Sequence, residues 1–126
     1  MSLTATMNAH LLTAVSQELA AASSDAYSAG ITRAGFNRLG TLLALERRGL
    51  LSSSVRSSGL TAFSLTRDGW EAISSTARTM AEAQIADAEA QIARFAGAPG
   101  LVAMAEREIA GAKQIVSKLD TGEEQS

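Results

Sequence analysis

The feature that most constrains this chain is a set of helix-ending and helix-starting signals between residues 45 and 70. An apolar stretch ends in Leu-Glu-Arg-Arg and is followed by Gly49, a residue common just after the last turn of a helix. Two short segments rich in Ser, Thr and apolar residues follow, and Thr66 then precedes Arg-Asp-Gly-Trp. Thr66 can cap a new helix, with Asp68 in the first turn, where a negative charge is favourable. This order predicts an α+β fold, mainly α with one small β-hairpin.

The two segments between these helices predict the strands of the hairpin. They are Leu51 to Val55 and Leu60 to Leu65, with residues 56–59 as the loop between them. In the second segment Phe63 and Leu65 alternate with smaller residues, so we expect both side chains to face the core.

Two helices are expected before residue 30. Residues 8–22 predict the first, with Asn8 as its cap. Ser24 or Asp25 would cap a short second helix that ends at Tyr27. The apolar residues that recur at helical spacing in the first helix are Leu11, Leu12, Val15 and Leu19.

A third helix is predicted within residues 31–48. Thr32 or Asn37 would cap it, and in the second case Gly35 and Phe36 form the preceding turn. On a helical wheel one half is apolar, with Phe36, Leu39, Leu42, Leu43 and Leu45. The other half carries Arg33, Asn37, Thr41, Arg47 and Arg48.

The C-terminal part predicts two long helices. One runs from Thr66 to about Phe95, residues 97–100 interrupt it, and the second spans 100–119. The predicted apolar seam includes Met80, Ile92, Val102, Ile109, Val116 and Leu119. These helices either close an antiparallel helical hairpin within the chain or serve as dimerisation helices, and the two roles are compatible.

The predicted organisation has three regions. Residues 1–75 hold the hairpin and the helices around it, 76–120 hold the helices for packing or dimerisation, and 121–126 form a polar tail that we expect to be disordered.

Charge is unevenly distributed along the chain. The whole chain has a formal net charge of −2, but residues 31–67 carry six arginines against Glu46 alone. Acidic residues predominate on both sides of this block. A local basic block in an acidic chain is typical of a surface that binds nucleic acid.

The central motifs resemble a known family. Leu45-Glu46, Gly49-Leu50, Phe63, Leu65-Thr66 and Gly69 stand where the winged helix-turn-helix of bacterial PadR-like and MarR-like transcriptional regulators has matching residues. The resemblance implies a winged helix-turn-helix that binds double-stranded DNA as a homodimer, in the manner of a repressor.

The resemblance also implies roles for the polar residues. The third helix would enter the major groove, and the hairpin would be a wing on the DNA backbone. Residues expected to read bases are Arg33, Asn37, Arg38 and Thr41; those expected to hold phosphates are Arg47, Arg48 and Arg67. The wing tip would contribute Arg56, Ser57 and Ser58, a single cation where the family has basic residues on both sides.

Other chemistry finds little support in the sequence. Cysteine is absent, so no thiol nucleophile is available. His10 is the one histidine, so no second histidine is available to activate a serine. We expect no enzymatic activity, no cofactor, no metal site and no membrane span, and a cytoplasmic location. The alternative is a winged-helix adaptor or inhibitor, encoded by a phage or mobile element, that binds a protein instead of DNA.

Overall fold

The computed structural model describes residues 3–33 and 37–120. The predicted turn at Gly35 and Phe36 and the predicted disordered tail at 121–126 lie outside the described residues. The elements in chain order are α1 (Ala5–Ser23), α2 (Leu39–Arg47), β1 (Leu51–Val55), β2 (Thr61–Leu65), α3 (Arg67–Ala72), α4 (Ser74–Arg94) and α5 (Pro99–Asp120). The chain is mainly helical with one two-stranded antiparallel sheet, which confirms the α+β prediction.

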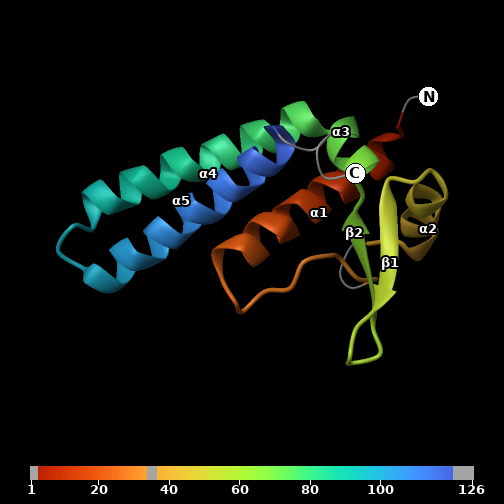
Figure 1. Cartoon of the computed structure of the whole chain (residues 1–126), viewed down its shortest axis with the longest axis horizontal. Helices are drawn as coiled ribbons and strands as arrows, with labels where there is room; N and C mark the ends of the chain where they lie inside the picture. The colour runs from red at the N-terminus through yellow and green to blue at the C-terminus, as the bar shows by residue number, and fades with distance from the viewer. Residues whose placement is uncertain (1–2, 34–36, 121–126) are drawn as a thin grey trace.

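Helix α1 lies between the two ends of the molecule (Figure 1). At one end are α2 and the β1–β2 hairpin, and toward the other end α4 and α5 extend side by side. None of the described helices combines the length and the apolar character needed to cross a membrane.

The start of α1 differs from the prediction. The side chain of Thr4 accepts a hydrogen bond of 3.0 Å from the backbone N–H of Met7, and the helix begins at Ala5. Asn8 therefore lies inside the helix and is not its cap. The prediction was wrong because Thr4 offers a capping oxygen one turn earlier.

The predicted short helix at residues 24–27 does not form. Ser24 ends α1, and a single turn bond joins the N–H of Tyr27 to the carbonyl of Ser24. A single helical turn fixes several backbone dihedral angles and gains only one hydrogen bond, so its formation is unfavourable. The segment is too short for further turns to offset this cost.

Helix α2 begins later than expected. Ile31 forms an antiparallel bridge with Phe63 through bonds of 2.8 and 2.7 Å, so its backbone is not available to a helix. The N-cap position is Arg38, and the side-chain amide of Asn37 donates to the carbonyl of Thr32 instead of capping. The prediction of a helix capped by Thr32 or by Asn37 was therefore wrong, because a long-range strand contact overrides local helix propensity.

The end of α2 and the hairpin agree with the prediction. Gly49 has a φ of +78°, the left-handed conformation that ends many helices. Strands β1 and β2 pair antiparallel, from Leu51 opposite Leu65 to Val55 opposite Thr61. Phe63 is 2% exposed, which confirms that it faces the core.

The long helix predicted from Thr66 to Phe95 is divided at Ile73. The Thr66 side chain accepts the N–H of Gly69 at 3.0 Å, which confirms the cap. Ile73 then has non-helical dihedrals, φ −126° and ψ 21°, and separates α3 from α4. Its side chain is buried with that of Trp70, so the bend allows α3 to pack on the core while α4 continues in another direction.

Helices α4 and α5 form an antiparallel hairpin within the chain, and α5 also packs on α1. The most buried residues of α5 are Ala105, Gly111, Ala112 and Ile115. The predicted seam residues Met80, Ile92, Val102, Ile109, Val116 and Leu119 are half-buried. The seam prediction missed Gly111 and Ile115 because α5 buries a face wide enough to contact two helices.

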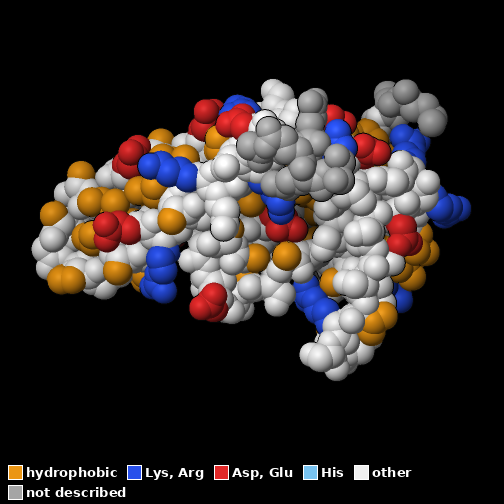
Figure 2. All heavy atoms as spheres, in the orientation of Figure 1, with side chains coloured by type: hydrophobic (Ala, Val, Ile, Leu, Met, Phe, Trp, Pro, Cys, Tyr) orange, Lys and Arg blue, Asp and Glu red, His pale blue; other side chains and the backbone are white. Residues whose placement is uncertain are grey.

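Apolar residues also remain on the surface of this hairpin. Phe95, Leu101 and Met104 are exposed near the loop that joins α4 to α5. Figure 2 shows apolar side chains at the surface of this end of the molecule, interspersed with charged ones.

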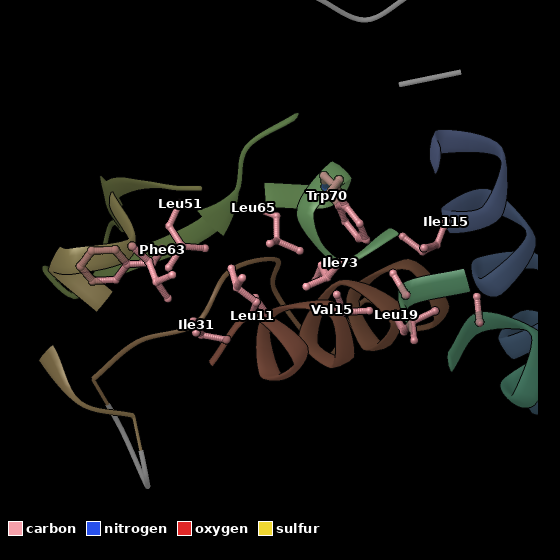
Figure 3. Close-up of a cluster of buried hydrophobic side chains, with 14 of the residues drawn as sticks. Leu11, Val15, Leu19, Ile31, Leu51, Phe63, Leu65, Trp70, Ile73 and Ile115 are labelled. Carbon is pink, nitrogen blue, oxygen red and sulfur yellow. The ribbon is translucent and has the colours of Figure 1, made fainter. Parts of the chain in front are cut away.

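One buried cluster joins both ends of the molecule (Figure 3). Helix α1 supplies Leu11, Val15 and Leu19, which contact apolar residues from the sheet on one side and from the helical hairpin on the other. The other large members are Ile31, Leu42, Leu45, Leu51, Phe63, Leu65, Trp70, Ile73 and Ile115. The positions of α2 and the β-hairpin are therefore fixed by packing on α1.

Candidate nucleic-acid interface

The basic block lies on α2 and on the segments next to it. Arg33 and Arg38 precede α2, Arg47 and Arg48 end it, and Arg67 begins α3. All five are exposed. Figure 2 shows basic and apolar side chains together along the edge of the molecule where α2 lies in Figure 1.

Four of these arginines have no acidic partner among residues 3–33 and 37–120. They are Arg33, Arg38, Arg47 and Arg67. The ion pair found in the described part joins Arg78 and Asp120, in α4 and α5. The one acid of the block, Glu46, accepts a hydrogen bond from the hydroxyl of Ser53 on β1. The charge of the four arginines therefore remains available to an anionic partner.

The Arg56 side chain does not extend into solvent from the hairpin tip but contacts the loop before Ile31. Its Nη2 donates to the carbonyls of Ala29 and Gly30, at 2.8 and 3.1 Å. The guanidinium thereby holds the loop before Ile31 against the hairpin. Ser57 and Ser58 are exposed at the tip, as expected.

The outer face of α2 is less polar than predicted. Leu42 and Leu45 are fully buried, but Leu39 and Leu43 are 40% and 38% exposed. The helical wheel assigned all four to the buried side. That assignment was wrong for Leu39 and Leu43, because α2 makes its main contacts with α1 and β1 and buries a narrow stripe.

The residues expected to read bases do not share one helix. Arg33, Asn37 and Arg38 all precede α2, and Thr41 is half-buried on it. The amide nitrogen of Asn37 is engaged with Thr32, at 2.8 Å. The structure therefore brings the arginines to one edge of the molecule but does not align these four residues as one recognition face.

His10 belongs to the scaffold of this region. The residue is 5% exposed, and its Nε2 accepts the backbone N–H of Arg38 at 2.9 Å. Its Nδ1 lies 2.8 Å from the carbonyl of Thr6, so the ring carries its proton on Nδ1 and both nitrogens are used. No local sequence signal reveals this role of His10, because the partner lies on another element. Within the described ranges no three or more His, Asp or Glu residues are grouped so as to hold a metal ion.

A hollow lies between the end of α1 and the helical hairpin. It has a volume of about 830 Å³, and Leu19, Met80 and Gln84 are among its lining residues. The Gln84 amide donates to Ser23 at 3.1 Å and to the carbonyl of Glu108 at 2.8 Å, which joins α4 to α1 and α5. The hydrogen-bonding capacity of this amide is therefore used within the fold.

A second, smaller hollow is lined by residues of α1 and α5. In it, Glu18 of α1 lies beside Lys118 of α5. Burial raises the pKa of Glu18 above its ordinary value of 4.5, and the positive charge of Lys118 opposes part of this rise.

Comparisons with known proteins assign no family to this arrangement: no family model, no curated protein and no solved structure matches the chain.

Proposed function

We propose that the protein is a sequence-specific regulator that binds double-stranded DNA, with α2 in the major groove. One observation carries the proposal: Arg33, Arg38, Arg47 and Arg67 are exposed around α2 and have no acidic partner in the described part of the chain. In a chain with a net charge of −2, a surface of this kind is matched to a polyanion.

The order of the elements supports the same proposal. The order α1, Ile31 bridge, α2, β1–β2 hairpin and α3 supports a winged helix of the kind that the PadR-like and MarR-like resemblance implies, although the predicted helix at residues 24–27 is not formed. An α-helix such as α2 is about 10–12 Å across with its side chains, which suits a major groove about 12 Å wide. Arg47, Arg48 and Arg67 would hold phosphates, and Arg33 and Arg38 would approach base edges.

The hairpin would contribute less to DNA binding than a wing with several basic residues would. Arg56 is engaged with Ala29 and Gly30, which leaves Ser57 and Ser58 to donate hydrogen bonds to the DNA backbone. Specificity would therefore depend mainly on α2.

We further propose that the regulator acts as a homodimer and represses by occupying its site. Two copies related by a two-fold axis would present two α2 helices about 34 Å apart to a pseudo-palindromic site. Exposed Phe95, Leu101 and Met104 offer an apolar contact that a second subunit would cover. Of the half-buried seam, Ile92, Val102 and Ile109 would extend that contact, whereas Met80, Val116 and Leu119 pack against the buried cluster of their own chain.

The test is fluorescence anisotropy of a labelled pool of mixed-sequence duplexes, at about 50 and 200 mM salt, with the mass in solution recorded alongside. We expect binding that falls steeply with salt and a dimer mass. The double change Arg47→Ala and Arg67→Ala should weaken binding and lower the salt slope by about 2. Lys113→Ala removes an exposed cation from α5, outside the basic block, and is the control. No binding by the folded protein at low salt would refute the proposal.

The second candidate is an adaptor or inhibitor that binds a protein through the same scaffold. It is favoured by the hairpin tip, where Val55 and Leu60 are 72% and 57% exposed. Apolar residues at such a tip suit a protein surface better than a phosphate backbone. If duplex DNA does not bind, the adaptor or inhibitor function is favoured. The double change Val55→Ser and Leu60→Ser should then weaken binding of the protein partner.

A further inference from the structure

The outer face of α2 carries two exposed leucines. Leu39 and Leu43 are four residues apart, so their side chains lie on the same side of the helix. Both are outside the buried cluster, and both are more exposed than the neighbouring Leu42 and Leu45. Gly40 lies beside them on the helix and is open: a Cβ atom at this position would have nothing within 4 Å. The face is thus an apolar surface with a flat place at its edge.

Positive charge borders this apolar face at both ends of α2. Exposed Arg38 comes directly before Leu39. Arg47 is one turn beyond Leu43, and its Nε lies 3.4 Å from the Leu43 carbonyl, so the guanidinium stays close to the second leucine. An occupant that complements this face must offer negative charge on its borders and apolar groups between them.

The major groove of DNA meets this description at particular base pairs. Its walls are phosphates, and the apolar group that it presents is the C5-methyl of thymine. We propose that Leu39 and Leu43 contact thymine methyl groups, and that Gly40 lets the α2 backbone approach the base edges beside them. The inference rests on the proposed function and makes it more specific: the preferred site contains A·T pairs opposite α2.

The experiment compares two duplexes that differ only in this methyl group. One is alternating dA–dT and the other is alternating dA–dU, at the same length and salt. Phosphates and minor groove are the same in both, so a change in affinity reports the major-groove methyl. We expect the uracil duplex to bind about fourfold more weakly for each methyl group that the wild-type protein buries. Alternating dG–dC and its 5-methylcytosine form give the reverse comparison, with tighter binding of the methylated duplex.

Variants assign the effect to the two leucines. Leu39→Ala and Leu43→Ala should each reduce the preference for thymine over uracil, and the double variant should abolish it. Leu60→Ala removes an exposed leucine from the hairpin tip and should keep the preference. All these side chains are exposed, so the variants should keep the circular dichroism spectrum and the thermal midpoint of the wild type.

Each outcome separates the inference from the function on which it rests. Salt-dependent binding with equal affinity for the thymine and uracil duplexes overturns the inference and leaves the DNA-binding proposal in place. A preference that survives in the Leu39→Ala, Leu43→Ala double variant also overturns it. Absence of binding to all four duplexes overturns both, and the apolar face is then a surface for an acidic amphipathic segment of a protein.

Discussion

The backbone N–H of Arg38 donates a hydrogen bond to Nε2 of His10, although 28 residues separate them in the chain. The imidazole is buried on α1, and its other nitrogen is bound to the Thr6 carbonyl of the same helix. Arg38 is the N-cap position of α2, and its own side chain makes no capping hydrogen bond. His10 therefore supplies the contact that holds the first turn of α2 to α1, and with it the exposed side chains of α2.

Replacing His10 with leucine should destabilise the fold. The change keeps an apolar side chain in the core but leaves the Arg38 N–H without its partner, and we expect a loss of about 1–3 kcal/mol in the free energy of unfolding. Urea denaturation followed by circular dichroism measures it. Thr13→Ala, which removes an exposed hydrogen bond to Ala9 on the same helix, should change stability by less than about 0.5 kcal/mol. Equal effects of the two changes would contradict a special role for His10.

Two glycine-to-alanine changes should have opposite effects. At Gly111, a Cβ would lie 2.5 Å from the Ser23 hydroxyl and 2.9 Å from the Ala22 carbonyl, so α5 and α1 would have to separate. We expect Gly111→Ala to destabilise by about 1–3 kcal/mol. Gly40→Ala has open space and a better helix former, so it should be neutral or stabilising by up to about 1 kcal/mol. Thermal unfolding compares them, and a stable Gly111→Ala variant would contradict the close packing of α1 on α5.

The raised pKa of Glu18 predicts a dependence of stability on pH. A raised pKa means that the folded state binds the proton more tightly than the unfolded state. The resulting stabilisation is fully present below the ordinary value of 4.5 and is lost as the pH rises through the folded-state pKa. Glu18→Gln should therefore be more stable than the wild type at about pH 7, and the difference should shrink in acid.

Urea denaturation over a range of pH tests this difference. Glu89→Gln removes one negative charge from an exposed face of α4 and is the control. A Glu18→Gln variant that is less stable than the wild type at neutral pH would show that the attraction of Lys118 outweighs the cost of burying the carboxylate.

Arg56 should matter for stability more than for DNA binding. Arg56→Ala removes two hydrogen bonds from a half-buried guanidinium to the Ala29 and Gly30 carbonyls. We expect a loss of about 1 kcal/mol in the free energy of unfolding. Its effect on duplex affinity should match that of Lys113→Ala, which removes an exposed positive charge from α5. A loss of affinity as large as that of Arg47→Ala would place the Arg56 side chain on the DNA instead.

Local signals account for the parts of the fold that the sequence predicted well. The turn at Gly49 needs one residue with positive φ, and the cap at Thr66 needs one oxygen three residues before Gly69. The hairpin between them follows from alternation and a short loop, and its register brought Phe63 into the core as expected. Each of these features depends on residues close together in the chain.

The sequence by itself determined the turn at Gly49, the hairpin, the cap at Thr66 and the concentration of arginines between residues 31 and 67. Tertiary structure alone decided that Ile31 pairs with Phe63, that α2 starts at Leu39, and that His10 is buried against Arg38. The physical reason is that these contacts join elements distant in the chain, and their free energy exceeds the small differences in local propensity. The same packing decided which leucines of α2 are buried and which remain on its surface.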